Sequence, residues 1–240
     1  MHLRFMSYNI QHGFDYVRKD RIDLSLTADV IRRYDSDIIG LNEVRGQGVI
    51  PEYFDQAKAL ADMLGYYYYF GPSIVFPERG PYGNAILSKY PIKHAEVIPI
   101  PDPSVKDEDT YYETRSILKA EFDIEGCREF TVYISHFGLA KAERKNAVET
   151  LLKVLENQEK PCVFMGDLNM TPDDMLVNAI SEKLKDTAVI FREPLLSFTS
   201  DKPTIKIDYM FVSNHIKVHY ADIPPVVVHD HRPYIAHIEI

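Results

Sequence analysis

Residues 165–169 combine the residue types that most clearly indicate chemistry in this chain. They read Met-Gly-Asp-Leu-Asn and follow an apolar run, 161–164, that is typical of a buried strand. Side chains two residues apart in an extended chain project from the same face, so Asp167 and Asn169 can contact one ligand. Open α/β sheets place their active sites where strands end. A simple turn after a strand also favours Gly, Asp and Asn, so this segment alone leaves both interpretations open.

Other polar residues at expected strand ends are candidates to meet Asp167. They are Asn9, Glu43, Ser135, His136, Asp208, Asp230 and His231. Glu43 follows the apolar residues 38–41 and offers hard oxygen ligands to a cation, whereas Asp208 lies in an otherwise apolar segment and needs a buried partner. Each residue alone also has an ordinary explanation as a turn, surface or core residue. Their joint occurrence at strand ends favours one shared site.

Composition narrows the class of protein. The chain has 240 residues, of which 45% are hydrophobic and 26% charged, as in ordinary globular proteins. It contains no apolar run long enough for a transmembrane helix and starts in a strand-like pattern without a signal peptide, so a cytoplasmic location is expected. Cys127 and Cys162 are too few and too far apart for a disulfide framework or a zinc cluster.

The net charge of −9 counts against a general nucleic-acid-binding protein. Non-specific binding to a phosphate backbone depends mostly on Lys and Arg, and the sequence has no basic run. A local basic patch or a bound metal ion would still allow nucleic acid to bind. Part of the negative charge fits a metal site rich in carboxylates. No feature of the sequence indicates an oligomeric state.

Periodicity predicts alternating helices and strands. Helices are expected over 22–34, 52–64 and 140–156, and another is expected to begin at Thr171, with Pro172 at the first helical position. Strands are expected over 3–10, 37–41, 66–70, 84–88, 92–100, 116–122, 130–136, 206–212, 216–220 and 234–240, besides the strand before Asp167. This pattern indicates two packed sheets with helices outside, in a single domain over residues 1–240.

Short polar motifs follow one another along the whole chain. They are Ser7-Tyr8-Asn9-Ile10, Leu41-Asn42-Glu43-Val44, Gly83-Asn84-Ala85-Ile86-Leu87-Ser88, Thr114-Arg115, Ser135-His136-Phe137, Gly166-Asp167-Leu168-Asn169, Ile207-Asp208-Tyr209 and Asp230-His231-Arg232-Pro233. In this order they closely resemble the endonuclease/exonuclease/phosphatase superfamily, which includes pancreatic-type deoxyribonucleases, abasic-site endonucleases, inositol polyphosphate 5-phosphatases and neutral sphingomyelinases. The resemblance implies a four-layered α/β sandwich, with two central, mostly antiparallel sheets flanked by helices and a site at one rim of the sheets.

The resemblance also implies a metal ion and an attacking water. Glu43 would bind Mg²⁺ or Mn²⁺, helped by Asn9 and Asp230. Asp167 would orient or deprotonate the water, and Asn169 would hold a phosphate oxygen. These roles agree with what hydrolysis of a phosphoester needs, namely an in-line water and a cation for the developing charge.

The remaining roles concern the phosphate. His231, oriented by Asp208, would donate a charge-assisted hydrogen bond to the phosphoryl oxygens, and His136 would do likewise from the other side. Arg115 would support the phosphate or the neighbouring carboxylates, and Asn84 is expected to bind substrate. Fixed donors of this kind stabilise charge that develops in the transition state.

The acidic, proline-rich segment 101–110 is expected to form a loop, either beside the active site or as a surface excursion, with the first interpretation favoured. Tyr111 and Tyr112 border this loop and precede Arg115. We therefore expect the loop and at least one tyrosine, with Tyr112 as the substrate-binding candidate, to line the pocket and repel long polyanions.

Departures from the resemblance leave the substrate open. The chain has no tryptophan and carries Thr204-Ile205-Lys206 where inositol phosphatases and abasic-site enzymes have Trp-containing motifs. His229 replaces the usual Ser or Thr and is expected to be either a substrate contact or a neutral exposed residue. The favoured function is a Mg²⁺- or Mn²⁺-dependent hydrolase that cleaves a phosphodiester or phosphomonoester of small or headgroup type by water attack. The alternatives are a DNA or RNA nuclease and a catalytically inactive binding module.

Overall fold

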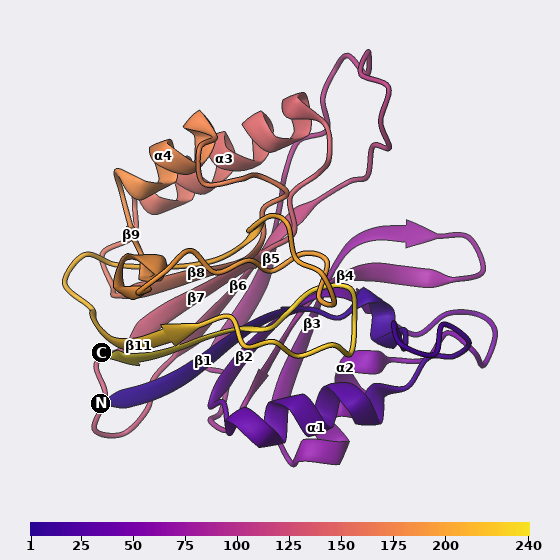
Figure 1. Ribbon diagram of the computed structural model, residues 1–240, viewed down its shortest axis with the longest axis horizontal. Helices are drawn as coiled ribbons and strands as arrows, with labels where there is room; N and C mark the ends of the chain where they lie inside the picture. The colour runs from indigo at the N-terminus through magenta and orange to yellow at the C-terminus, as the bar shows by residue number, and fades with distance from the viewer.

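The computed structural model describes residues 1–240 as four layers, with two six-stranded sheets face to face between two layers of helices (Figure 1). The first sheet has, in spatial order, β11 (Lys217–Asp222), β12 (Tyr234–Glu239), β1 (His2–Asn9), β2 (Ile38–Arg45), β4 (Gly80–Ser88) and β3 (Tyr67–Phe76). The second has β5 (His94–Pro99), β6 (Ser116–Phe122), β7 (Phe130–Ser135), β8 (Cys162–Asp167), β10 (Asp208–Val212) and β9 (Lys185–Asp186).

Helices cover the outer face of each sheet. The helices α1 (Leu24–Tyr34) and α2 (Gln56–Leu64) pack on the first sheet, and α3 (Lys141–Leu155) and α4 (Met175–Ser181) pack on the second. Two short 3-10 helices, η1 (Gln11–Gly13) and η2 (Thr187–Ile190), lie in connections. Each sheet has one parallel pair, β1 with β2 and β7 with β8, and its other pairs are antiparallel. The expected four-layered sandwich is confirmed.

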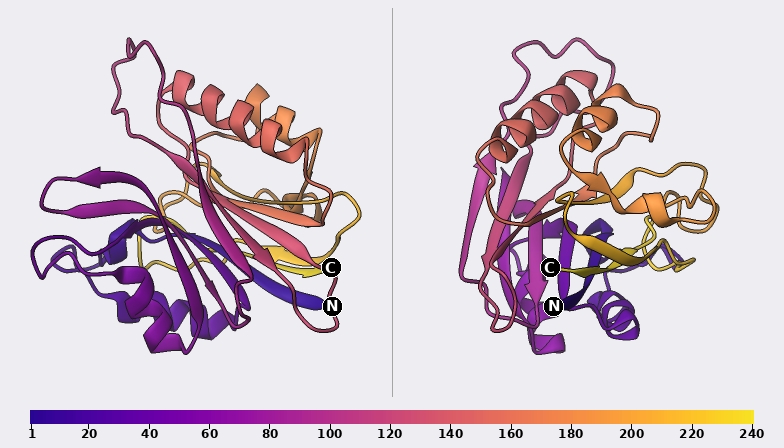
Figure 2. Two further views of the ribbon diagram at one scale, coloured as in Figure 1. Left: turned by 180° about the vertical axis from the view of Figure 1, so that it is seen from behind. Right: turned by 90° about the vertical axis from the view of Figure 1, so that its left-hand side faces the viewer.

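Apolar side chains fill each of the three interfaces between layers. In β1, Leu3 and Phe5 point toward the second sheet, whereas Met6 and Tyr8 point toward the helices. Both faces of the strand are therefore covered and each buries apolar side chains. The same arrangement recurs in β8, where Met165 faces the first sheet and Phe164 faces α3 and α4. The two views in Figure 2 show the sheets stacked between the helices, with the chain termini side by side.

The strand directions bring the polar residues to one rim of the sandwich. Asn9 ends β1 and pairs with Asn42 in the parallel strand β2. Asp167 ends β8, and Asp208 lies opposite it as the first residue of the antiparallel strand β10. His136 directly follows β7, the parallel neighbour of β8. The ends of strands from both sheets therefore meet at this rim.

Some expected boundaries were wrong. Glu43 lies inside β2 rather than after it, at a bulge between Leu41 and Val44 where its φ is 59°. The helix α4 begins later than expected, because Asp174 and not Thr171 caps it by accepting from the backbone N–H of Leu176. The strand β9 and the helix η2 were not expected. None of the helices is long and apolar enough to cross a membrane.

Candidate active site

A cavity of about 430 Å³ opens at this rim, where the two sheets meet. Its walls include most of the residues that the sequence singled out, namely Glu43, Arg115, His136, Asp167, Asn169, Asp230 and His231. Asp208 and Asn9 are fully buried behind these residues and contact them. The structure thus brings together nearly all of the candidate catalytic and metal-binding side chains.

His231 and Asp208 form the hydrogen bond that their sequence positions predict. The Nδ1–H group of His231 donates to Oδ2 of Asp208 at 2.8 Å, and the ring of Phe198 lies 4.8 Å from the imidazole, centre to centre. Burial lowers the pKa of His231, but the charges of Asp208 and Asp167 outweigh it and raise the pKa to about 10. His231 is therefore a cation at neutral pH, with Nε2 directed toward Asp167 at 3.5 Å.

Asp167 is fixed by donors on each of its oxygens. Its Oδ2 accepts from Nδ2 of Asn9 at 3.1 Å, and its Oδ1 accepts from the backbone N–H of Asn169 at 2.9 Å. Burial raises the pKa of Asp167 to about 7, against the opposing charge of His231. The preceding Gly166 has a φ of +149°, and a Cβ there would lie 1.8 Å from the carbonyl oxygen of Ser135. Only glycine allows β8 to approach β7 so closely.

His136 and Arg115 also line the cavity. Nη1 of Arg115 donates to Nδ1 of His136 at 3.0 Å, so the ring proton is on Nε2, which lies 3.4 Å from Oδ2 of Asp167. Burial, and then the charges of Arg115 and His231, hold the pKa of His136 well below its usual value. His136 is therefore neutral, whereas a charged ring was expected. Asn169 donates from Nδ2 to the carbonyl of Phe137 at 2.9 Å, which fixes its side chain.

Glu43 and Asp230 both line the cavity and are the carboxylates that the sequence predicts as ligands of a divalent cation. Oε1 of Glu43 accepts from Asn9 at 3.0 Å and Oε2 accepts from the hydroxyl of Tyr82 at 2.8 Å. Oδ1 of Asp230 is buried and has no hydrogen-bond partner. Burial, reinforced by Glu43, raises the pKa of Asp230 to about 6. A hard cation would satisfy the unpaired oxygen and the adjacent carboxylates together, so these residues fit Mg²⁺ or Mn²⁺.

Asn9 takes a different orientation from that of a metal ligand. Its Oδ1 accepts from the backbone N–H of Gln11 at 3.1 Å, and its Nδ2 donates to both Glu43 and Asp167. Asn9 thereby connects the candidate metal carboxylate to the candidate base.

Asn84 does not reach the cavity. It is buried between the sheets, where its Oδ1 accepts from Asn42 at 2.8 Å and its Nδ2 donates to the carbonyl of Ser116 at 3.2 Å. Asn42 in turn donates to the carbonyl of Ser135 at 3.1 Å and accepts from the backbone N–H of Asp167 at 3.0 Å. These two amides, referred to below as the amide bridge, join the first sheet to the second behind the active site.

The loop 101–110 and its tyrosines also lie away from the cavity. The loop projects past the N-terminal end of α3 (Figure 1), where Glu108 accepts from the backbone N–H groups of Lys141 and Ala142 at 3.0 and 3.2 Å. The hydroxyl of Tyr112 accepts from the backbone N–H of Glu108 at 3.0 Å, and Tyr111 is 59% exposed. The structure therefore places Tyr112 in contact with a helix-capping loop and not among the residues that line the pocket.

His229 matches neither of the two expectations for it. It is fully buried, with Nδ1–H donating to the carbonyl of Phe14 and Nε2 accepting from the hydroxyl of Thr27, both at 2.8 Å. Burial lowers its pKa to about 4, so the ring is neutral. His229 thus anchors the segment before Asp230 to the first helical layer.

Sequence reasoning missed several residues of the site. Tyr82 supports Glu43, Arg144 donates from Nη1 to the carbonyl of Asn169 at 2.7 Å, and Phe198 packs on His231. Only Asn42 carried a signal, because it is a buried amide next to Glu43 in an apolar strand. The others reach the site through tertiary contacts that no local pattern reports.

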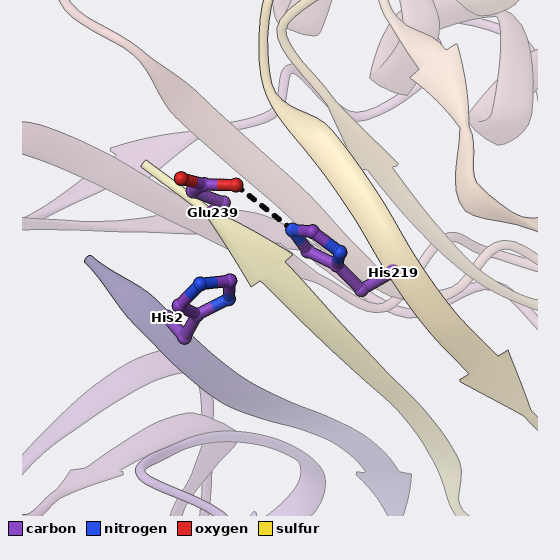
Figure 3. A group of neighbouring side chains, drawn as sticks. All are labelled: His2, His219 and Glu239. Atoms are coloured by element: carbon purple, nitrogen blue, oxygen red, sulfur yellow. Dashed lines mark hydrogen bonds and ion pairs between the residues drawn. The ribbon is translucent and has the colours of Figure 1, made fainter.

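Another group of metal-ligating atoms lies outside the cavity. His2, His219 and Glu239 come from the neighbouring strands β1, β11 and β12 and are exposed, and His219 contacts Glu239 through Nε2 at 2.9 Å (Figure 3). Because His2 begins β1 and Asn9 ends it, the strand separates this group from the cavity by about 23 Å. We treat it as distinct from the candidate active site.

Known proteins provide an independent comparison. Residues 6–231 match the sequence profile described as the Endonuclease/Exonuclease/phosphatase family. The chain belongs to this family. Protein cwh43 of Schizosaccharomyces pombe is 26% identical over 196 residues, which cover 78% of this chain but 18% of that protein. The uncharacterized protein YbhP of Escherichia coli is 27% identical over 226 residues, covering 88% of this chain and 85% of YbhP.

A solved structure of a family neighbour supports the same fold. The mannosyl-6-phosphatase Bt3783 of Bacteroides thetaiotaomicron superposes with a TM-score of 0.76 at 21% identity, covering 99% of this chain and 100% of that one. The similarity concerns the arrangement of both sheets and the helices outside them.

Proposed function

We propose that this family member is a divalent-metal-dependent hydrolase that cleaves a small phosphomonoester or phosphodiester by water attack. The observation that carries the proposal is the set of charges around the cavity: the buried His231 cation between Asp208 and Asp167, with the unpaired oxygen of Asp230 nearby. Phosphoryl transfer needs positive donors for the charge that develops on the phosphoryl oxygens and a base for the attacking water. A group of charged side chains that only stabilised the fold would not need a cavity beside it.

Each residue has a task that follows from its contacts. Glu43 and Asp230 would hold the divalent cation, which when bound offsets negative charge on the phosphoryl oxygens. Asp167, as the carboxylate, accepts a proton from the attacking water, and Asn9 and Asn169 hold that carboxylate in place. His231 and His136, whose Nε2 atoms lie 3.5 and 3.4 Å from Oδ2 of Asp167, would donate to the phosphoryl oxygens.

The two histidines donate differently to the phosphoryl oxygens. His231 donates as a cation, and Asp208 fixes its ring so that Nε2–H faces the cavity. His136 donates as a neutral ring from Nε2–H, because Arg115 occupies its Nδ1. Removing one such preorganised donor typically lowers kcat by about 10²–10³.

The size and charge of the protein favour a small substrate. A cavity of about 430 Å³ is in the range of small-molecule sites, about 300–1,000 Å³. The net charge of −9 disfavours long polyanions. The structural neighbour Bt3783 is named a mannosyl-6-phosphatase, which is consistent with a phosphorylated small molecule. A nuclease is the second candidate, and an inactive binding module is disfavoured because Glu43, Asp167 and His231 are all in place.

A substrate panel tests the proposal. We would measure p-nitrophenol release from p-nitrophenyl phosphate and bis-p-nitrophenyl phosphate, and phosphate release from sugar phosphates and an inositol phosphate. Headgroup release from a phospholipid and strand cleavage of plasmid DNA would be measured as well, each with Mg²⁺ and with EDTA. Hydrolysis of small phosphoesters that requires Mg²⁺ and disappears in Glu43→Gln and His231→Ala supports it. Efficient cleavage of plasmid DNA with small esters left intact would favour the nuclease, and no hydrolysis at all would favour the binding module.

A further inference from the structure

We propose that a pocket beside the active site binds a second phosphate group carried by the same small substrate. The inference rests on the proposed function and specifies its substrate as a bisphosphorylated molecule. The pocket has a volume of about 180 Å³, and its walls include His12, Arg45, Phe76, Arg79, Tyr82 and Glu113. No catalytic role described above uses its two arginines.

Tyr82 connects this pocket to the candidate catalytic centre. Its ring forms one wall of the pocket, and its hydroxyl donates to Oε2 of Glu43 at 2.8 Å. Arg45 lies two residues after Glu43 in β2 and pairs with Tyr82 in the neighbouring strand β4. A substrate whose scissile phosphate lies at Glu43 therefore needs to extend past only one side chain to reach Arg45.

The charges of the pocket are not balanced within the protein. Neither Arg45 nor Arg79 forms an ion pair, although the chain is acidic and several other arginines do, among them Arg4, Arg21 and Arg32. The acid in the pocket, Glu113, is engaged by Nη1 of Arg115 at 3.1 Å. Two guanidinium groups that face one pocket repel each other, and a phosphate bound between them removes that repulsion through charge-assisted hydrogen bonds.

His12 adds an unpartnered donor to the pocket. Its Nδ1 is buried and has no hydrogen-bond partner. Burial, and then the charge of Arg45, lowers the pKa of His12 to about 4, so the ring is neutral and can present an N–H group to a phosphate oxygen. A buried ring nitrogen without a partner is costly in a folded protein, so a rotation of the His12 ring that brings this nitrogen to a ligand oxygen would be favourable.

Hydrogen bonds fix the backbone around the pocket before any ligand binds. The tip of the β3–β4 hairpin, which extends beyond the sheet in Figure 1, is tied to the segment after β2 by hydrogen bonds from Gly46 N–H to Pro81 O at 2.8 Å and from Val49 N–H to Glu78 O at 3.0 Å. Gly80 has a φ of +78°, and a Cβ there would lie 2.6 Å from the carbonyl oxygen of Gln47. The guanidinium of Arg45 lies 4.9 Å from the centre of the Tyr53 ring. A site ordered in this way loses little entropy when it binds an anion.

Matched substrate pairs test the inference. We would measure kcat/KM with Mg²⁺ for glucose 6-phosphate against glucose 1,6-bisphosphate, and for propane-1,3-diol monophosphate against its bisphosphate, which has a shorter spacing. The wild-type protein should prefer the bisphosphate of at least one pair by about tenfold or more, because each guanidinium–phosphate contact is charge-assisted. In Arg45→Gln and Arg79→Gln the preference should fall toward unity. The exposed Arg128, which makes no ion pair, provides the matched control Arg128→Gln, which should keep it.

Calorimetry separates this inference from the proposed function. Binding of the same pairs is titrated into Asp167→Asn with Mg²⁺, with and without Arg79→Gln. Arg79 is exposed at the hairpin tip, so its replacement tests the site even where Arg45→Gln fails to fold. Equal use of both members of each pair, or a preference unchanged in the arginine variants, overturns the inference and leaves the proposed function standing. Tighter binding of a bisphosphate that Arg79→Gln abolishes, without any hydrolysis by the wild type, supports the pocket and contradicts the hydrolase. Loss of plasmid cleavage alone in the arginine variants would assign the pocket to a nucleic acid instead.

Discussion

The hydrogen-bonded pair of Asp208 and His231 allows the role of His231 to be tested by a substitution that replaces a single oxygen atom with nitrogen. Asp208→Asn keeps the shape of the side chain but removes its charge. The charge of Asp208 is the largest effect that raises the pKa of His231 to about 10, against the lowering effect of burial. We expect the pKa of His231 to fall by at least about two units in the variant, because the charge of Asp167 would then be the main effect left to oppose the lowering by burial. Two pKa units correspond to about 2.7 kcal/mol, which is about a 100-fold change in the fraction of charged donor once the pH is well above 10.

The pH dependence distinguishes this effect from a general loss of structure. We would measure kcat and KM for p-nitrophenyl phosphate, or for the best substrate of the panel, from pH 6 to pH 10. In the wild type, activity should fall above about pH 10 as His231 loses its proton. In Asp208→Asn this fall should move to about pH 8, so the variant should lose about 10-fold at pH 9 and little at pH 6.5. The value of KM should change much less than kcat, because the donor acts mainly in the transition state.

A matched control and thermal unfolding complete the test. Asp107→Asn makes the same acid-to-amide change in the exposed loop 101–110, where the carboxylate has no bonded partner, and should leave the profile unchanged. Rates are compared only at temperatures where both variants are folded. If Asp208→Asn keeps both the wild-type rate and the wild-type basic limb, then Asp208 does not maintain the charge of His231 and the proposed donor role is refuted.

Three further predictions follow from the site. Activity should disappear in EDTA and return with Mg²⁺. The variant His219→Ala should respond identically, because the exposed group of His2, His219 and Glu239 lies far from the cavity. Loss of the metal dependence in His219→Ala would contradict this prediction. Gly166→Ala should lower the free energy of unfolding, measured by urea titration, by at least about 3 kcal/mol, since the new Cβ would meet the carbonyl of Ser135. The control Gly126→Ala has open space around the new Cβ and should lower it by only about 1–2 kcal/mol, because of the positive φ alone. The rate should rise with pH through about 7, because the raised pKa of Asp167 leaves this base protonated at lower pH; a flat profile from pH 5 to 8 would exclude it as the base.

The parts of the site that follow strand ends could be predicted from the sequence. Asn9, Asp167 and His136 each come at the end of an apolar strand, and parallel neighbours within a sheet bring such ends to one rim. The apolar surroundings of Asp208 similarly required a buried partner, which is His231. These predictions depended only on the period of the strands and on the cost of burying a charge.

The rest depended on contacts between elements that are distant in sequence. The loop 101–110 precedes Arg115, which suggested a place in the wall of the site, yet none of its residues lines the cavity and Glu108 instead caps α3. Asn84 looked like a strand residue that could face substrate, but it bonds across the space between the sheets. Glu43 points into the cavity because of a bulge in β2, and no residue type in the sequence marks that bulge.

The amide bridge has a consequence for how the two sheets remain aligned. The first sheet supplies Glu43 and the second supplies Asp167, so the catalytic groups meet only at one relative position of the sheets. Apolar packing between sheets is non-directional and tolerates a small slide, whereas the hydrogen bonds of Asn42 and Asn84 have defined length and angle. The bridge therefore fixes the relative position of the two sheets, which an apolar interface alone would allow to shift. Replacing Asn42 and Asn84 with hydrophobic residues of equal volume would keep the sandwich folded. Glu43 and Asp167, however, would no longer be held at a fixed distance from each other.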